Sequence, residues 1–304
     1  MASQDNRPPF PETIDSTILG TFRSCPQKMF RQYMEHWKPA QESVHLVAGG
    51  AFAAGVEYAR RAFYVEGKGA ELAEAVGLKA LISKYGAFEC PAESAKSLER
   101  MCGALAFYFD QYPLGNDGAN PIDRAGVRGI EFSFAEPLPV MHPVTGNPIL
   151  YTGRADMIAD FAGGKYAYDE KTTSSLGPSW SKQWDMRSQF TGYCWASRES
   201  GLPLQGVIVR GISILKTKYD TQQAITYRPD WFIDRWLDQT IKDLHRMIEC
   251  WESGVWDYDL DHACAEYSGC PFQRVCLAKD PQPWLEGYFV KRKWDPLIRE
   301  EVEI

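Results

Sequence analysis

The stretch Gly153–Thr172 has the sequence GRADMIADFAGGKYAYDEKT and predicts two strands joined by a tight turn. The residues on either side of the turn follow the two-residue period of a strand. Between them lie Gly163 and Gly164, which can supply the positive φ angles that a hairpin turn requires. We therefore expect an antiparallel hairpin whose two ends lie side by side.

Three charged side chains come together at the open end of this hairpin. Asp156 lies near the start of the first strand, and Asp169 and Lys171 lie near the end of the second. Because side chains alternate along a strand, Asp169 and Lys171 share a face and Glu170 points away. Two carboxylates and an ammonium at one place are suited to holding a divalent cation and to attacking a phosphodiester.

The composition allows a large buried core and excludes some classes of protein. The chain has 304 residues, of which 44% are hydrophobic and 13% aromatic, and its net charge is −7. An acidic chain is not coated with positive charge for nucleic acid, but a basic groove remains possible because the local field governs contact. No stretch reaches the length of a membrane span, and the polar segment Met1–Pro11 lacks a signal peptide's apolar run. We expect a cytoplasmic protein.

The order of predicted elements indicates an α/β fold with a central mixed β-sheet flanked by helices. Helices are predicted at Ser16–His36, Gly49–Tyr64, Ala70–Tyr85, Ser94–Tyr112, Ser179–Glu199 and Trp231–Trp251. Strands are predicted at Val127–Phe134, Ile149–Phe161, Lys165–Thr173, Gly206–Lys216 and Gln222–Arg228, with Pro137–Pro148 as a loop or hairpin connection and an irregular tail from Gly254.

Domain organisation follows from the absence of a long Pro, Gly or Ser linker. We expect a single domain over residues 1–304. Within it, the helical part covers 12–125, the sheet core 126–230, and the last helix and tail 231–304.

Three motifs resemble those of the PD-(D/E)XK nuclease superfamily. They are Gly153-Arg154-Ala155-Asp156, then Asp169-Glu170-Lys171, then Gln189-Phe190-Thr191-Gly192-Tyr193. The last is similar to the Gln-x-x-x-Tyr signature of the RecB-type exonuclease branch, which includes CRISPR-associated exonucleases and the nuclease domains of AddAB-like helicases. Its Gln and Tyr are four apart and share a helix face. The resemblance implies a restriction-endonuclease-like core.

The resemblance also implies a role for each motif residue. Asp156 and Asp169, with the main-chain carbonyl of Glu170, would bind Mg²⁺ or Mn²⁺. Lys171 would orient and activate the attacking water. Gln189 and Tyr193 would position the strand or the lysine.

One position departs from the family pattern. RecB-type sequences usually carry a metal-binding histidine in an early helix, but the matching stretch Gly49–Glu57 has none. Glu57 is carried as a possible metal ligand instead, with an exposed helix glutamate as the alternative. The resemblance further implies a supporting role beside the metal site for Glu131, which could equally be a solvent-facing strand residue.

Four cysteines form a second constellation, because Cys264, Cys270 and Cys276 resemble the C-terminal cluster of iron–sulfur members of this branch. There the fourth ligand comes from the N-terminal region, where Cys25 fits. Four thiolates suit a [4Fe–4S] cluster or a Zn²⁺ ion, and His262 could join a zinc version. The metal would join the N- and C-terminal segments. The alternative is four unrelated buried thiols.

Basic and aromatic residues near the motifs are candidates for gripping DNA. The candidates are Lys28 and Arg31, Arg60 and Arg61, Lys182 and Arg187, with Trp180 and Trp184 for base stacking. Core packing is the alternative for the aromatic residues.

The function implied by the resemblance is a metal-dependent DNA exonuclease that acts at DNA ends. Recombination, repair, phage replication and CRISPR spacer processing are its expected settings, with a helicase, recombination or CRISPR integration protein as a possible partner. A non-catalytic DNA-binding subunit of such an assembly and a site-specific endonuclease are the alternatives.

Overall fold

The computed structural model describes residues 7–124, 127–259, 262–265, 269–296, 298 and 302. The chain divides into two compact units, each built from separate segments. Unit 1 comprises Met1–Gln41, Ala135–Gly153 and Asp234–Arg299, and unit 2 comprises Glu42–Phe134, Arg154–Ile233 and Glu300–Ile304. This division differs from the three consecutive parts predicted, and the single domain over the whole chain stays a prediction.

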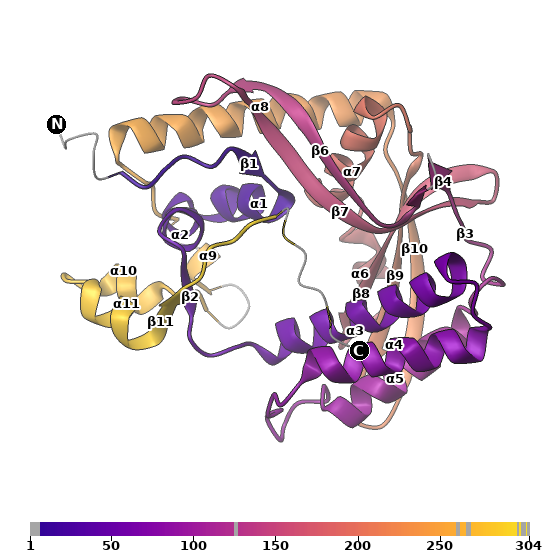
Figure 1. Ribbon diagram of the computed structural model, residues 1–304. Helices are drawn as coiled ribbons and strands as arrows, with labels where there is room; N and C mark the ends of the chain where they lie inside the picture. Colours follow the sequence, from indigo (N-terminus) through magenta and orange to yellow (C-terminus); the bar gives the residue numbers. More distant parts are fainter. Residues whose placement is uncertain are drawn as a thin grey trace. The chain divides into compact units, whose positions relative to one another are not determined.

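Unit 2 contains most of the sheet and a group of helices (Figure 1). Its helices are α3 (Val44–Arg60), α4 (Ala70–Tyr85), α5 (Leu98–Gln111), α6 (Pro178–Lys182) and α7 (Ser188–Glu199), and a π-helical turn (Arg61–Val65) extends α3. Its strands are β3 (Asn120–Pro121), β4 (Asp123–Arg124), β5 (Val127–Arg128), β8 (Gly164–Thr173), β9 (Gly206–Ile214) and β10 (Tyr219–Tyr227).

The long strands β6 (Ile130–Met141) and β7 (Pro148–Phe161) and the helix α8 (Asp230–Ser253) contribute residues to both units. The remaining elements belong to unit 1. They are β1 (Thr13–Ile14), α1 (Ser16–Ser24), α2 (Pro26–Met29), a π-helical turn (Phe30–Met34), β2 (Trp37–Pro39), α9 (His262–Ala265), α10 (Gln273–Leu277), α11 (Gln282–Tyr288) and β11 (Phe289–Lys291).

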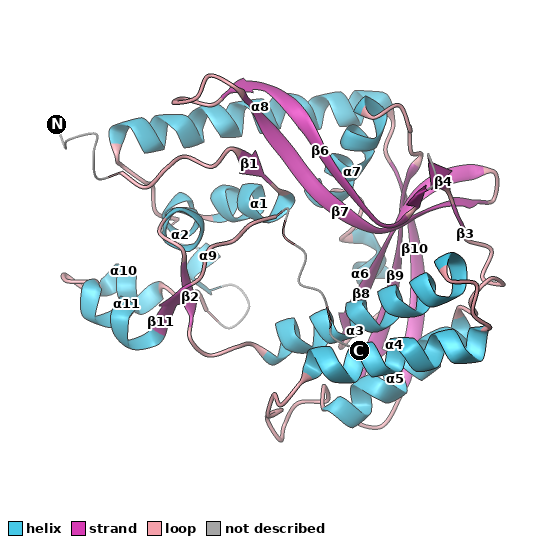
Figure 2. Ribbon diagram, in the orientation of Figure 1, coloured by secondary structure: helices cyan, strands magenta, loops and turns pink. Residues whose placement is uncertain are grey.

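The sheet is mixed, as predicted. Its strand order is β1-β7-β8-β9-β10, with β3 and β6 also paired to β7 (Figure 2). The β7–β8 and β9–β10 pairs are antiparallel, and the β8–β9 and β1–β7 pairs are parallel. The predicted α/β fold with a central mixed sheet flanked by helices is therefore confirmed.

Helices cover both faces of this sheet in unit 2. On β9, a Cβ at Gly211 would lie 2.2 Å from the Trp180 ring of α6, so the missing side chain makes room for this helix. The neighbouring Arg210 points to the other face, where its guanidinium lies 4.2 Å from the ring centroid of Tyr112, just after α5. Buried residues of α3, α4 and α5 pack on that face with Ile212 of β9.

The predicted hairpin is confirmed, with a shift of one residue in its turn. The register pairs Met157 with Tyr168 and Phe161 with Gly164, which leaves a two-residue loop. The positive φ angles occur at Ala162 (48°) and Gly163 (83°), as in a type I′ turn. Gly164 already belongs to β8, where a Cβ would lie 2.4 Å from the Gln205 side-chain oxygen.

Several predicted boundaries were wrong. Short breaks divide two of the predicted helices, and one strand is longer than predicted. The helix predicted at Ser16–His36 is broken at Cys25, which is extended (φ −161°, ψ 110°) because Pro26 follows it. The helix predicted at Ser179–Glu199 consists of α6 and α7. The strand β6 continues to Met141, through most of the region predicted as a connection.

Unit 1 joins residues from the two ends of the chain. β2 and β11 form an antiparallel pair, in which Trp37 lies opposite Lys291 and Pro39 opposite Phe289. Trp37 and Phe289 also pack in a small core with Phe272, Val275 and Leu285. Among the described residues, no helix is long and apolar enough to cross a membrane.

Candidate active site

The two predicted catalytic carboxylates lie where the β7–β8 ladder ends. The last paired residues are Met157 and Tyr168, so Asp156 and Asp169 occupy the next position along the two strands. There the main-chain N–H of Glu170 donates a hydrogen bond to Asp156 Oδ2 at 2.9 Å, in place of a backbone partner. Asp156 and Asp169 thus lie side by side, as predicted. The Glu170 main chain helps to hold the Asp156 carboxylate at this position.

Lys171 completes the group, because its ammonium forms an ion pair with Asp169 Oδ2. Asp169 is 2% exposed, whereas the Lys171 side chain is 32% exposed. Burial by itself would lower the pKa of Lys171, but the charges of Asp169 and Asp156 raise it. Lys171 is therefore a protonated hydrogen-bond donor that can still reach solvent or a ligand.

Both carboxylates are held in an environment that resists their ionisation. Burial raises the pKa of Asp156 well above its usual value, and the charges of Asp169, Glu170 and Glu131 raise it further. Burial likewise raises the pKa of Asp169, although the adjacent Lys171 opposes this shift. A proton or a cation between the two carboxylates would relieve their repulsion.

The donor set fits a hard divalent cation. Asp156 and Asp169 offer carboxylate oxygens, which Mg²⁺ and Mn²⁺ prefer. In the described part of the chain, no group of three or more His, Cys, Asp or Glu side chains is arranged so that it could hold a metal ion. Two carboxylates supplemented by main-chain oxygen, water and substrate phosphate are nevertheless the usual ligands of Mg²⁺ in phosphoryl-transfer sites.

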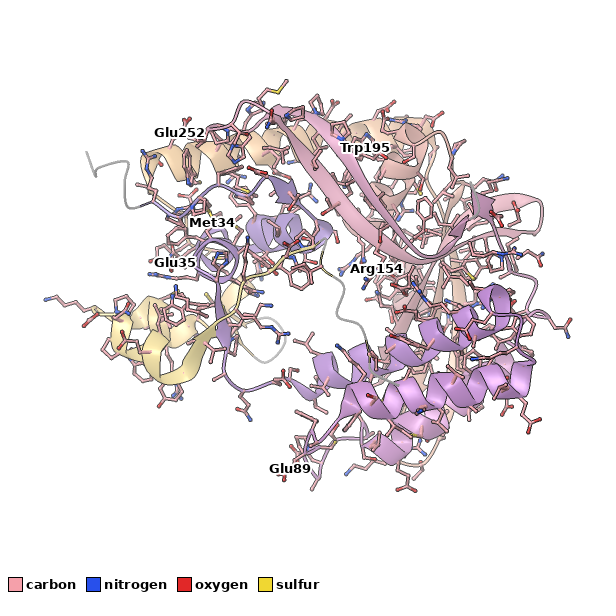
Figure 3. The ribbon with its side chains drawn as sticks, in the orientation of Figure 1. Met34, Glu35, Glu89, Arg154, Trp195 and Glu252 are labelled. Atoms are coloured by element: carbon pink, nitrogen blue, oxygen red, sulfur yellow. The ribbon has the colours of Figure 1, made fainter. Side chains whose placement is uncertain are left out.

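Gln189 and Tyr193 contact the strand that carries Asp156. Gln189 Nε2 donates to the Tyr193 hydroxyl at 2.7 Å, and that hydroxyl donates to the main-chain oxygen of Arg154 at 2.8 Å. Arg154, labelled in Figure 3, lies two residues before Asp156 on β7. These contacts hold the main chain of β7 near Asp156, and the two roles implied for Gln189 and Tyr193 stay predictions.

Glu57, predicted as a possible metal ligand, and Glu131, predicted as a supporting residue, are placed differently. Glu57 on α3 forms an ion pair with Arg61 Nε at 3.0 Å. Glu131 on β6 pairs with Arg154 Nε at 2.6 Å, and its side chain is 8% exposed. The charge of Glu131 raises the pKa of Asp156. Glu131 also has a positive φ of 53°, an uncommon conformation for a non-glycine residue. Glu131 is therefore placed as a supporting acid, and metal binding by Glu57, whose side chain is 10% exposed, stays a prediction.

The residues expected to bind DNA fall into three groups. Lys182 and Arg187 are exposed, and the charge of Arg187 lowers the pKa of Asp169 against the effect of burial. Trp180 and Trp184 were expected to stack on bases with core packing as the alternative, and the alternative fits, since they are 6% and 7% exposed and Trp184 packs against Trp180 and Phe190. Lys28 and Arg31 belong to unit 1.

Arg60 was also expected to contact DNA, but it is only 3% exposed. Arg61, also expected to contact DNA, has a side chain that is 37% exposed and pairs with Glu57. The prediction did not include Arg154, whose side chain is 42% exposed and pairs with Glu131. The Gly-Arg-x-Asp motif contained the signal for Arg154.

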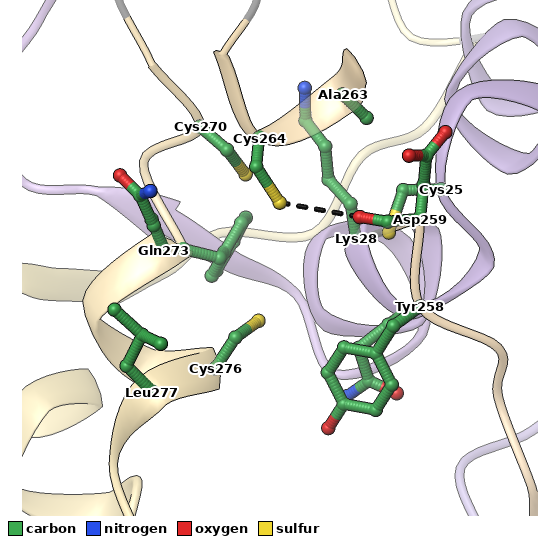
Figure 4. Close-up of a pocket in the computed structure, with 12 residues that line it drawn as sticks. Cys25, Lys28, Tyr258, Asp259, Ala263, Cys264, Cys270, Gln273, Cys276 and Leu277 are labelled. Carbon is green, nitrogen blue, oxygen red and sulfur yellow. Dashed lines mark hydrogen bonds between the residues drawn. The ribbon is translucent and has the colours of Figure 1, made fainter. Parts of the chain in front are cut away.

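The four predicted metal-binding cysteines line one cavity of about 220 Å³ in unit 1 (Figure 4). Cys25 enters it from the break between α1 and α2, beside Lys28. Cys276 lies on α10. The Cys270 N–H donates to the Cys264 carbonyl at 3.0 Å. All eight cysteines are free thiols.

The thiols repel one another as anions. Burial raises the pKa of Cys276 to about 11, with contributions from Cys270, Cys25 and Cys264. Burial also raises the pKa of Cys270, and the Lys28 ammonium opposes this shift. Among the described residues, these cysteines do not form a group of three or more side chains arranged to hold a metal ion. Tetrahedral Zn²⁺ needs sulfur atoms only about 3.8 Å apart, given Zn–S bonds of about 2.3 Å.

Comparison with known proteins assigns the family. The model of the PD-(D/E)XK nuclease superfamily matches residues 16–277, which is most of the chain and includes every motif described above. The chain therefore belongs to the PD-(D/E)XK nuclease superfamily. The curated proteins contain no match to this chain.

A solved structure shows a similar fold. A candidate exonuclease from Eubacterium rectale is 13% identical, with a TM-score of 0.51, and the alignment covers 88% of this chain and 93% of that one. At this identity the likeness concerns the fold alone. A protein designated SSO0001 is 17% identical over 76% of each chain, with a TM-score of 0.33 that is too low to support an argument.

Proposed function

We propose that this protein is a Mg²⁺- or Mn²⁺-dependent DNA exonuclease of the RecB type. The observation that carries the proposal is the meeting of Asp156, Asp169 and Lys171 at the end of the β7–β8 ladder. The superfamily implies a nucleic acid substrate. The resemblance of Gln189 and Tyr193 to the Gln-x-x-x-Tyr signature of the RecB-type exonuclease branch supports action at DNA ends. Recombination, repair, phage replication and CRISPR spacer processing are settings that need such an activity.

The chain's own residues have distinct tasks in this reaction. Asp156 and Asp169, with the Glu170 main-chain carbonyl, would hold the cation. A bound divalent cation would supply positive charge that stabilises the phosphate in the transition state and favours ionisation of the attacking water. The Lys171 ammonium donates hydrogen bonds that can orient this water or a phosphate oxygen.

The test is digestion of end-labelled single- and double-stranded oligonucleotides with Mg²⁺ or Mn²⁺, with 5′ and 3′ labels compared. Asp169→Asn should lower the rate by at least about 100-fold, since it removes a carboxylate that acts on the transition state. Asp160→Asn is the matched control, because Asp160 lies on the same hairpin but is exposed. Its carboxylate forms an ion pair with the Lys165 ammonium at 3.2 Å. Full activity in pure Asp169→Asn protein would refute the site.

Two alternatives remain distinguishable from this proposal. A non-catalytic DNA-binding subunit would bind the oligonucleotides without degrading them at any metal concentration. The buried pairing of Asp169 with Lys171 argues against it, because a retired site has no physical reason to keep buried opposite charges together. A site-specific endonuclease would cut closed circular DNA, which an exonuclease leaves intact.

We also propose that the four cysteines hold a [4Fe–4S] cluster. The support is that all four cysteines line one cavity and that their positions resemble those of iron–sulfur members of the RecB-type branch. Protein purified without oxygen should be brown and contain about four irons per chain. Colourless protein with one zinc per chain would show instead that the thiols hold Zn²⁺.

A further inference from the structure

The side chain of Glu170, the middle residue of the Asp-x-Lys motif, is locked on the opposite face of β8 from Lys171. Arg60 Nη1 donates to Glu170 Oε2 at 3.1 Å, and Arg60 Nη2 donates to Oε1 at 2.5 Å. The Tyr108 hydroxyl donates to Oε1 at 3.0 Å. The Arg60 and Glu170 side chains are 4% and 2% exposed. A two-pronged Arg–carboxylate pair of this kind fixes the orientation of the carboxylate.

The electrostatic consequences for Glu170 are strong. Burial by itself would raise its pKa, but the charge and hydrogen bonds of Arg60 lower it below the usual value, so Glu170 is ionised. A buried ion pair is weak evidence for stability, because desolvation opposes the attraction between the charges. A contribution to folding stability therefore does not explain why this pair lies behind the two aspartates.

The main chain of Glu170 explains the placement of the pair. On one side, Glu170 is paired with Arg210 in the β8–β9 ladder. On the other side the ladder has ended, and the Glu170 N–H holds Asp156 Oδ2. The N–H and C=O of one strand residue point to the same edge, so the Glu170 carbonyl faces that edge as well. The rotation of this one residue therefore sets both a hydrogen bond to Asp156 and the direction of a candidate metal-binding oxygen.

We propose that Arg60 and Tyr108 are positioning residues for the divalent cation, which act by anchoring the Glu170 side chain and thereby its main chain. The inference rests on the proposed function. It assigns to Arg60 a task in the metal site although the guanidinium lies on the far face of the sheet. Partners that orient metal ligands typically change metal affinity 10- to 100-fold when they are removed.

A second buried ion pair on the same face provides a matched control. Arg210 Nη1 pairs with Asp117 Oδ2 at 2.5 Å, and their side chains are 1% and 8% exposed. Asp117→Asn breaks a pair of the same type and burial without removing any hydrogen bond to Glu170. It should lower the melting temperature, as substitutions of Arg60 or Glu170 do, and leave the metal affinity unchanged.

The experiment is a Mn²⁺ titration of the full-length protein without DNA, with free Mn²⁺ followed by electron paramagnetic resonance. Arg60→Met and Glu170→Gln change the local charge in opposite directions, so a purely electrostatic role would strengthen binding in one and weaken it in the other. Arg60, Tyr108 and Glu170 together form the lock. If the lock positions the metal-binding oxygen, both variants should weaken Mn²⁺ binding by at least about tenfold. Tyr108→Phe removes a hydrogen bond to Glu170 without changing the charge, so weaker Mn²⁺ binding in this variant decides the matter if Arg60→Met does not fold.

The outcomes separate this inference from the proposed function. Asp169→Asn should abolish the tight Mn²⁺ binding of the wild type. If the wild type has no such Asp169-dependent binding, the proposed function and the lock both fail. If the wild type binds Mn²⁺ and the two lock variants bind it equally well, only the lock fails. An equal loss of affinity in Asp117→Asn would also overturn the lock, by assigning the effect to general loosening of the fold.

Discussion

Neighbouring residues of β8 perform opposite tasks because their side chains point to opposite faces. Asp169 and Lys171 form the ion pair of the candidate site, whereas Glu170 between them is held by Arg60. The alternation of a strand makes this separation possible. Residues 169–171 therefore carry charge on both faces of β8. A substitution of Asp169 or Lys171 acts through the ion pair between them, whereas a substitution of Glu170 acts through Arg60.

Tyr193 links α7 to the strand that bears Asp156, so its hydroxyl should matter for activity and stability. Tyr193→Phe leaves the Arg154 carbonyl and the Gln189 amide without this partner, and we expect a loss of about 1–3 kcal/mol of unfolding free energy. The nuclease rate should fall as β7 shifts. Chemical denaturation and the oligonucleotide assay measure the two effects. Unchanged values in both would remove Tyr193 from the site.

The raised pKa of Asp156 predicts that stabilisation by metal depends on pH. The folded-state pKa lies above the unfolded value of about 3.9, so the metal-free protein loses stability as the pH rises from that value toward the folded pKa. A cation binds the ionised form and offsets this loss. Mn²⁺ should therefore raise the melting temperature more at about pH 7.5 than at about pH 5.5. A larger shift at the lower pH would contradict the assignment.

At the scale of the elements, short irregularities aim the side chains of the sites. The extended Cys25 between α1 and α2 brings a thiol into the cavity, and the positive φ of Glu131 accompanies its pairing with Arg154. The hairpin turn contains a third irregularity, because Ala162 has a φ of 48°. Strain of this type costs free energy in the folded state.

Ala162→Gly should stabilise the protein by up to about 1 kcal/mol, because glycine adopts the left-handed conformation without a Cβ penalty. The residue is exposed, so no packing is lost. The change in melting temperature measures the effect, and nuclease activity should remain at the wild-type level. Gly163→Ala, at a φ of 83° in the same turn, should destabilise the protein. The same sign for both variants would contradict the type I′ turn.

At the scale of the whole molecule, each candidate site lies within one unit. The motif residues from Asp156 to Tyr193 and their partner Arg60 belong to unit 2, whereas Cys25 and the three C-terminal cysteines belong to unit 1. A metal at the cysteines would connect residue 25 to residues beyond 260 and close a very long loop, which constrains the unfolded chain. The cysteine site is therefore expected to stabilise unit 1.

Cys270→Ser should remove the bound metal and lower the melting temperature, because a ligand is lost from the cavity. Mn²⁺ binding that depends on Asp169 should persist, since all described ligands of that site belong to unit 2. Iron analysis, calorimetry and the Mn²⁺ titration measure the three quantities. Loss of Mn²⁺ binding in folded Cys270→Ser protein would mean that the two sites depend on each other.

Local features of the chain were predictable. The helix Ala70–Tyr85 was predicted at its observed bounds, and the hairpin and its three charged residues follow from alternation and turn chemistry. The break at Cys25 was missed although Pro26 signals it. The burial of Arg60 was missed, and that of Trp184 was left as an alternative, because exposure depends on which elements pack against a residue. Neither periodicity nor composition contains that information.

The sequence by itself determined the two-residue alternation, the hairpin and the spacing of the motifs, because these depend on backbone preferences within about twenty residues. Only the tertiary structure decided that Glu170 is paired with Arg60, 110 residues away, and that four cysteines line one cavity. Such partners are selected by how helices and strands pack, and many residues of the right charge compete for each position until the fold excludes all but one.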